Sequence, residues 1–203
     1  MNRTKLVGMI LTVVLLAASA AMGGPAPGDE APGFTLTDTE GNEHTLQNYL
    51  DDNRTVVLEW FNPDCPFIKK HHLNHKTMDE TFAAVSKDQP IVWLAINSNA
   101  KGKQGYGLER NRKAVKEYEM TFPVLLDESG EVGRAYGAKT TPHMFIVTPD
   151  GKVAYAGAID SDKSADKLGE SNYVLDFLNA MAAGKELPAA ETKPYGCSVK
   201  YAK

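Results

Sequence analysis

A single cysteine that follows an apolar strand and begins a helix restricts the fold of this chain more than any other feature. Residues 55–61 read Thr-Val-Val-Leu-Glu-Trp-Phe, a β-branched and aromatic run that is typical of a buried strand. Asn62-Pro63-Asp64 is typical of a turn. Cys65 then precedes Pro66, and proline favours the first position of a helix. The sequence therefore predicts a strand–turn–helix unit with Cys65 at the helix N-terminus.

Cys65 has the chemistry of a nucleophile at this position. The first backbone N–H groups of a helix have no partner within it, and the positive end of the helix dipole lies there. Both effects favour the thiolate, which is the reactive form of cysteine. The alternative is a buried and unreactive cysteine, although buried cysteines usually lie inside elements rather than at helix starts. We therefore expect Cys65 to be the catalytic nucleophile.

The N-terminus has the composition of a targeting segment. Arg3 and Lys5 are basic, and residues 6–18 are apolar or small without interruption. Ala18-Ser19-Ala20 then matches a small-residue cleavage site. We expect residues 1–23 to be a signal peptide and the mature protein to be periplasmic or secreted. An uncleaved anchor is the alternative, so contact with a membrane is expected only through this segment.

Charge and cysteine content narrow the class of partner. The formal net charge is −4, which is a poor match for nucleic acid or an anionic membrane. Export places the protein in an oxidising compartment, where disulfides persist. The two cysteines, Cys65 and Cys197, are too few for a disulfide scaffold in a chain of 203 residues. They can be a redox pair, one structural bridge, or a reactive thiol with a bystander.

Predicted strands alternate with predicted helices along the rest of the chain. Residues 24–33 form a linker, residues 34–184 form one domain, and residues 185–203 form an extended tail that carries Cys197. The alternation predicts an α/β fold with helices on both faces of one sheet. Predicted strands are 55–61, 90–97, 123–126, 143–147 and 152–156, predicted helices are 66–87, 108–120, 131–136 and 173–183, and residues 34–45 form a hairpin.

Five motifs between residues 26 and 183 are specific as a set. They are Ala31-Pro-Gly-Phe-Thr-Leu36, Trp60-Phe-Asn-Pro-Asp-Cys-Pro66, Phe122-Pro-Val-Leu-Leu-Asp127, Arg134-Ala-Tyr-Gly137 and Thr140-Thr-Pro-His-Met-Phe-Ile146. With them the chain resembles the thioredoxin-like superfamily, in its branch of thiol-specific antioxidant (AhpC/TSA or redoxin), peroxiredoxin-like and TlpA-like proteins. The tail motif Gly196-Cys197-Ser198 is similar to a narrower peroxiredoxin-like group. The resemblance implies a thioredoxin-like fold with a central mixed β-sheet.

The resemblance also implies which residues form the site. Cys65 falls on the first cysteine of the thioredoxin Cys-x-x-Cys motif, and Ile68 replaces the second. Peroxiredoxins place their peroxide-attacking cysteine at the position of Ile68, so the standard peroxidase constellation is missing. Pro142 matches the cis-proline that packs against the active cysteine in this family. Its neighbours Thr141 and His143 are then expected to bind substrate with it.

Glu59 and Cys197 are further candidates for catalysis. Glu59 lies on the predicted buried strand, near where thioredoxin buries an aspartate, and a buried acid needs a partner or a task. We expect a proton relay, with a satisfied structural carboxylate as the alternative. A thiol that attacks a disulfide remains in a mixed disulfide until a second thiol releases it. Cys197 on the extended tail is the candidate for this resolving thiol, unless it stays free or pairs between molecules.

The histidines allow several interpretations. His71 and His75 are four residues apart on one predicted helix, so they could hold a metal, but apolar residues share their face and favour satisfied, half-buried side chains. His72 shares the other side with Lys69 and Lys76, where charge would favour the Cys65 thiolate or simply form a solvated face. His143 is expected near Cys65 as a proton donor or acceptor, or at the surface as the start of a strand.

These observations predict an exported thiol–disulfide oxidoreductase that uses Cys65 and Cys197. Its partners are expected to be protein or small-molecule thiols and disulfides, with peroxides as a further class and without nucleic acid. A thiol-dependent peroxidase that forms a sulfenic acid on Cys65 is one alternative. A metal- or partner-binding module without activity is another, although one cysteine makes a poor soft-metal site. No cofactor motif is present, so neither a cofactor nor a metal is expected.

Overall fold

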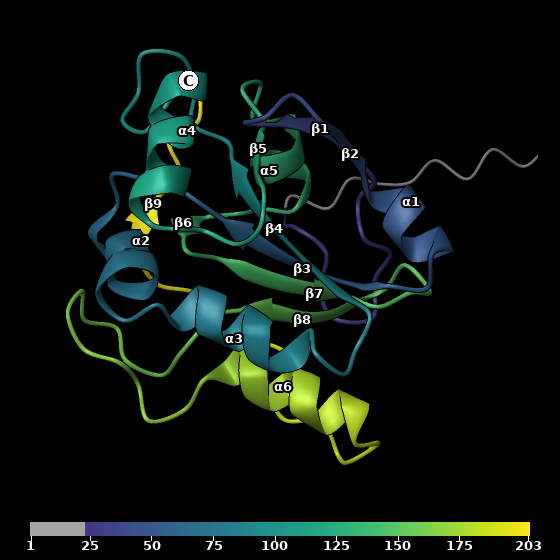
Figure 1. Cartoon of the computed structure of the whole chain (residues 1–203). Coiled ribbons are helices and arrows are strands. Elements are labelled where there is room, and N and C mark those ends of the chain that lie inside the picture. The colour runs from purple at the N-terminus through teal and green to yellow at the C-terminus, as the bar shows by residue number, and fades with distance from the viewer. Residues whose placement is uncertain (1–22) are drawn as a thin grey trace, which may run out of the picture.

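The computed structural model describes residues 23–203, and its centre is a seven-stranded sheet (Figure 1). In sheet order the strands are β2 (Glu43–Thr45), β1 (Thr35–Asp38), β5 (Val124–Leu126), β4 (Ile91–Asn97), β3 (Thr55–Trp60), β7 (Met144–Val147) and β8 (Val153–Gly157). The central strands β5, β4 and β3 are parallel, and the outer strands pair antiparallel. The predicted mixed sheet and the N-terminal hairpin are therefore confirmed.

Helices cover both faces of the sheet, as predicted. One face packs against α3 (Thr77–Val85), α4 (Leu108–Glu117) and α6 (Tyr173–Ala182), and the other against α1 (Leu46–Asp51) and α5 (Glu131–Ala135). Alternate residues of β3 contribute to two separate apolar cores, Val57 to the first and Val56 to the second, because successive side chains of a strand point to opposite faces. The six-residue α1 was not predicted, because so short a helix shows little periodicity.

The single long helix predicted over residues 66–87 is wrong. The segment begins with α2 (Pro66–Lys69), continues as a π-helical turn η1 (Lys70–Asn74), and starts again as α3. Lys76 separates the parts with a left-handed backbone, φ 53°. The helical backbone is therefore interrupted before α3.

Burial of three consecutive polar residues accounts for this break. Lys70, His71 and His72 all have no exposed surface, and an amphipathic α-helix with a single buried stripe does not provide that arrangement. The wide turn closes where the N–H of His75 donates to the carbonyl oxygen of Lys70 at 3.0 Å. Turns of this kind are frequent at functional sites.

A second, two-stranded sheet joins the C-terminal tail to the domain. The strands are β6 (Thr140–Thr141) and β9 (Cys197–Ser198), which run antiparallel. Figure 1 shows β6, β9 and α2 gathered at one end of the central sheet. The extended tail was predicted, but its pairing with β6 was not.

The N-terminal segment that the structure describes lies along β8. Gly28 donates to the carbonyl oxygen of Val153 at 2.8 Å, and Val153 donates to that of Asp29 at 2.9 Å. The predicted signal peptide lies outside the described residues except for Gly23. Within residues 23–203, no helix combines the length and the apolar character needed to cross a membrane.

Candidate active site

Cys65 lies between the end of β3 and the start of α2, as predicted. It is the N-cap residue of α2, and Pro66 follows in the first turn. Its thiol does not cap the helix but donates a hydrogen bond to the carbonyl oxygen of Thr141 at 3.1 Å. The side chain has no exposed surface. In this conformation an external molecule therefore cannot touch the sulfur of Cys65.

Helix α4 holds the turn that precedes Cys65. Arg110 donates from Nε to Oδ1 of Asp64 at 2.9 Å and from Nη2 to the carbonyl oxygen of Pro63 at 3.1 Å. Tyr118 donates its hydroxyl to the same carbonyl at 2.5 Å. The position of Cys65 is thus set by side chains from a distant part of the chain.

The C-terminal tail occupies the backbone edge beside Pro142. The peptide bond from Thr141 to Pro142 is cis, in agreement with the family resemblance. Thr141 pairs with Cys197 in the β6–β9 sheet. Gly196 has a φ of 132°, and a Cβ atom there would lie 2.2 Å from the carbonyl oxygen of Thr141, so this contact requires glycine. The protein's own tail therefore pairs with the backbone of Thr141, one of the residues that the sequence analysis expected to bind substrate.

The structure brings Cys197 to Cys65. Thr141 pairs with Cys197 and accepts the hydrogen bond of Cys65, so the two free cysteines lie beside the same residue. Burial, together with the hydrogen bond and charge of Cys65, raises the pKa of Cys197 to about 12. Cys197 keeps some exposure, whereas Cys65 has none. The expected pair is thus adjacent, and the roles of nucleophile and resolving thiol stay predictions.

Glu59 lies in a buried charged cluster with His72. Nε2 of His72 donates to Oε1 of Glu59 at 2.7 Å, and the Trp93 indole donates to Oε2 at 3.1 Å. Nδ1 of His72 faces Asp79 at 3.6 Å. Burial opposes the charge on His72, but Glu59 and Asp79 outweigh it and raise its pKa to about 9. Both oxygens of Glu59 have partners within the core, which is what a structural carboxylate requires, and the proton relay stays a prediction.

The solvated face expected for His72 is therefore wrong. His72 has no exposed surface and packs between the rings of Phe61, Tyr118 and Phe122. The helical spacing that placed it beside the lysines does not apply, because His72 lies in a π-helical turn and its Nε2 contacts Glu59 of β3.

The ring of His143 packs against the second core. Its ring packs 4.5 Å from that of Phe145, and its Nδ1 accepts from the N–H of Lys139 at 3.4 Å. Burial, followed by the charge of Lys139, lowers the pKa of His143 to about 4. His143 lines a cavity of about 650 Å³ together with tail residues 191–194. The alternative of a surface histidine is wrong, because His143 is buried, and its proton exchange with Cys65 stays a prediction.

His71 and His75 face different partners. His71 is fully buried rather than half-buried, and its Nε2 lies 2.9 Å from the hydroxyl of Tyr195. His75 bonds through Nε2 to the carbonyl oxygen of Asp166 at 2.9 Å. Within the part of the chain that the structure describes, no group of three or more His, Cys, Asp or Glu side chains is arranged to hold a metal ion.

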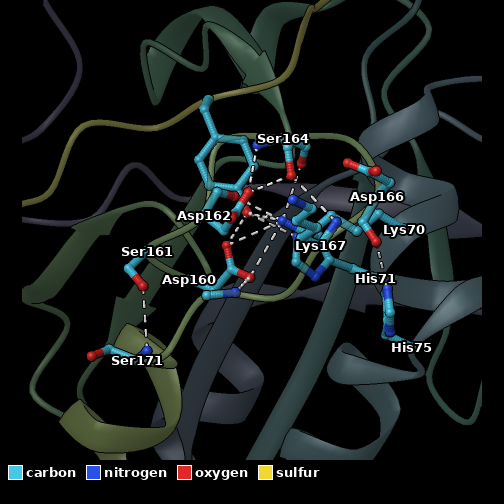
Figure 2. A network of polar contacts seen from close by, with 12 residues as sticks. Lys70, His71, His75, Asp160, Ser161, Asp162, Ser164, Asp166, Lys167 and Ser171 are labelled. Atoms are coloured by element: carbon cyan, nitrogen blue, oxygen red, sulfur yellow. Dashed lines mark hydrogen bonds and ion pairs between the residues drawn. The ribbon is translucent and has the colours of Figure 1, made fainter.

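A buried polar network joins the segment after Cys65 to the tail before Cys197. Figure 2 shows Lys70 and His71 pointing into the loop that contains Asp160, Asp162 and Ser164. The hydroxyl of Tyr195, from the tail, contacts Lys70, His71 and Asp160. Sequence analysis missed this network because a lysine in a predicted helix resembles any solvated lysine. The only available signal was the position of Tyr195, two residues before Cys197.

Comparisons with known proteins match most of the domain. The Redoxin family model covers residues 26–174. The thiol-disulfide oxidoreductase ResA of Geobacillus thermodenitrificans is 30% identical over 154 residues, which are 70% of this chain and 82% of that protein. A putative peroxiredoxin of Mycobacterium tuberculosis is 28% identical over 143 residues, 67% of this chain and 79% of that protein.

Solved structures show the same fold. An uncharacterized conserved protein of Geobacillus kaustophilus superposes with a TM-score of 0.73 at 28% identity, covering 87% of this chain and 92% of that one. The thioredoxin domain of a thiol-disulfide oxidoreductase of Bacteroides vulgatus gives a TM-score of 0.53 at 22% identity, covering 64% and 87%. The second likeness concerns the fold alone, and it confirms the predicted thioredoxin-like architecture.

Proposed function

The chain belongs to the Redoxin family, and from this premise we propose that it is an exported thiol–disulfide oxidoreductase with Cys65 as nucleophile and Cys197 as resolving thiol. Its partners are protein or small-molecule disulfides and thiols. The observation that carries the proposal is the β6–β9 pairing, which places Cys197 opposite Thr141 while Thr141 accepts the hydrogen bond of Cys65. Cys197 at this position can act as the resolving thiol, the role that the second cysteine of a Cys-x-x-Cys motif would have.

The proposed reaction is two successive thiol–disulfide exchanges. The Cys65 thiolate attacks one sulfur of the partner's disulfide, and the other sulfur leaves as a thiolate. The Cys197 thiolate then attacks the Cys65 sulfur, and the remaining partner sulfur leaves. The partner's disulfide gains two electrons and becomes a dithiol, and Cys65 and Cys197 become a disulfide.

The environment of Cys197 supports this order of events. As a thiolate, Cys65 contributes to the raised pKa of Cys197 through a hydrogen bond and through its charge. Once Cys65 is part of a mixed disulfide, its charge is gone and that contribution disappears. Cys197 therefore becomes easier to deprotonate at the step in which it must attack.

Access to Cys65 requires movement of the tail. Cys65 has no exposed surface while β9 is paired with β6, so an incoming disulfide reaches it only after this pairing opens. In the reverse direction, a partner thiolate attacks the Cys65 sulfur of the oxidised pair and Cys197 leaves as a thiolate, so the reverse reaction also needs access to Cys65. Export rests on the residue pattern of positions 1–23.

Peptide mapping and turnover of single-cysteine variants test the proposal. We expect the protein purified from its export compartment to yield a linked Cys65–Cys197 peptide that mild reduction separates. Cys65→Ser should abolish turnover with a protein disulfide, whereas Cys197→Ser should accumulate a mixed disulfide on Cys65. Full turnover by Cys65→Ser would overturn the proposal.

A thiol-dependent peroxidase is the second candidate, favoured by the relative described as a putative peroxiredoxin. The Cys65 thiolate would attack the peroxide, forming a sulfenic acid and releasing water or an alcohol, and Cys197 would condense with it to a disulfide and water. Peroxide consumption with thioredoxin or glutathione as donor measures this directly. Oxidoreductase turnover without peroxide consumption would remove the candidate.

A further inference from the structure

Lys70 is a fully buried lysine whose ammonium group is held by the loop and the tail. It donates to the carbonyl oxygens of Asp162 at 2.7 Å and Ser164 at 3.2 Å. It also faces a carboxylate oxygen of Asp160 at 3.4 Å and the hydroxyl of Tyr195 at 3.3 Å. A buried charge is costly unless it is paired and hydrogen-bonded, so these contacts tie the loop and the tail to η1.

The hydroxyl of Tyr195 is the centre of this network. It donates to Asp160 and accepts from Lys70 and from Nε2 of His71. Burial and Asp160 both raise the pKa of Tyr195, so the hydroxyl remains a donor. Burial, followed by Lys70, lowers the pKa of His71 to about 3, so its ring is neutral and Nε2 carries the donated proton. The Tyr195 hydroxyl therefore donates one hydrogen bond, to Asp160, and accepts two, from Lys70 and His71.

The network connects the two chain segments that carry the cysteines. Lys70 and His71 belong to the helical segment that Cys65 begins, and Tyr195 lies two residues before Cys197. The ring of Tyr195 also packs 5.8 Å from that of Phe67, on the first turn of α2. Beyond Cys197 the tail is attached to other parts of the domain, for example where Val199 donates to the carbonyl oxygen of Lys139 at 3.1 Å.

We propose that Tyr195 and Lys70 are positioning residues, which hold Cys197 against Cys65 and so set the stability of the disulfide between them. The inference rests on the proposed function, because it concerns the same redox pair. A disulfide within one chain forms more readily when its thiols are already held together, since less freedom is lost in bringing them into contact. Without the Tyr195 hydroxyl the tail leaves η1 more often, and the dithiol gains relative to the disulfide.

The test is the equilibrium of the full mature protein with glutathione buffers of known ratio. Tyr195→Phe keeps the ring against Phe67 and removes only the hydroxyl. We expect the equilibrium constant for the Cys65–Cys197 disulfide to fall about tenfold, a shift of about 30 mV in reduction potential. In the reduced protein, alkylation of Cys65 should also accelerate.

Tyr136→Phe is the matched control. It also removes one hydroxyl from a buried tyrosine, but that hydroxyl donates to the carbonyl oxygen of Pro32 at 2.9 Å, away from the cysteines. We expect its disulfide equilibrium to stay within twofold of wild type. Equal equilibria for Tyr195→Phe and wild type would overturn the inference, and so would equal shifts in the two tyrosine variants.

A second variant and the wild type complete the experiment. If Tyr195→Phe does not fold, Lys70→Met provides the same comparison, because Asp160 still accepts from Tyr195 and from the N–H of Gly169. A tenfold fall supports the positioning role, and an unchanged equilibrium contradicts it. Failure of the wild type to form any Cys65–Cys197 disulfide would instead overturn the redox pair of the proposed function.

Discussion

Two buried polar clusters begin at the same π-helical turn and differ in what they hold. The inner cluster joins His72 to Glu59 of β3 and to Asp79 of α3, so it lies entirely within the domain. The outer cluster joins Lys70 and His71 to the tail through Tyr195. Neighbouring residues of one turn therefore have different roles: the inner cluster lies within the domain, and the outer cluster attaches the tail that carries Cys197.

The largest expected effect is that of Glu59→Ala on stability. It leaves the charged, fully buried His72 with Asp79 at 3.6 Å as its remaining partner. Removing one member of a buried ion pair typically costs about 3–5 kcal/mol, and we expect a loss of this size in urea unfolding of the reduced protein. The Cys65–Cys197 equilibrium of the folded protein should change by less than twofold.

Glu59→Gln distinguishes the structural role of Glu59 from a proton relay. The amide oxygen still accepts from His72, so the variant should fold and lose less stability than Glu59→Ala. With a structural role alone, the rate of exchange at Cys65 follows the wild-type pH profile. A slower exchange with a displaced pH profile would establish the relay and place the inner cluster in the chemistry as well.

Adjacent histidines predict opposite pH dependences for the two clusters. The pKa of His72 rises from 6.5 to about 9 on folding, so its contribution to stability is complete below pH 6.5. It is lost as the pH rises through 9, by up to about 3 kcal/mol. The pKa of His71 falls from 6.5 to about 3. The unfolded chain then binds the extra proton below pH 6.5, and stability declines as the pH falls toward 3.

Urea unfolding of the reduced protein between pH 3 and pH 9 measures both declines in stability, the one at high pH (the alkaline limb) and the one at low pH (the acid limb). His72→Phe combined with Glu59→Gln, so that no unpaired carboxylate is left beside the ring, should remove the decline between pH 6.5 and 9 and leave the acid limb. His71→Phe should reduce the acid limb only in part, because burial also lowers the pKa of His143 to about 4. An alkaline decline that persists undiminished in the double variant would show that His72 is not its origin.

The two clusters also show which features of the site the sequence could not predict. Local chemistry sufficed for Cys65, because a β-branched run, a turn and Cys-Pro define a strand–turn–helix unit within a dozen residues. Burial of Lys70 and His72 depends on Asp160 and Glu59, which no helical period reveals. The β6–β9 pairing joins two dipeptides from distant positions, and two residues show no alternation. The strand–turn–helix unit and the approach of Cys197 to Cys65 were therefore predictable, whereas the break after Lys69, the β6–β9 pairing and the buried polar contacts were not.

Gly196→Ala disturbs the β6–β9 pairing at a position outside both clusters. The added Cβ would lie 2.2 Å from the carbonyl oxygen of Thr141, in a backbone conformation that favours glycine. We expect a loss of about 1–3 kcal/mol and an increase of at least tenfold in the alkylation rate of Cys65. Gly184→Ala is the control, because it shares a positive φ but has open space around it. An unchanged alkylation rate in Gly196→Ala would show that the tail does not cover Cys65.

The smallest expected effect comes from a site outside both clusters. Asn172 caps α6 by accepting the N–H of Leu175 at 3.0 Å, and it donates to the hydroxyl of Thr81 at 2.8 Å. Asn172→Ala should cost about 1 kcal/mol in urea unfolding. The cost should be equal in the dithiol and disulfide forms, because neither bond involves the tail, so the Cys65–Cys197 equilibrium should not change. A shift in that equilibrium would mean that any loss of stability loosens the tail, and the distinction between an inner and an outer cluster would no longer hold.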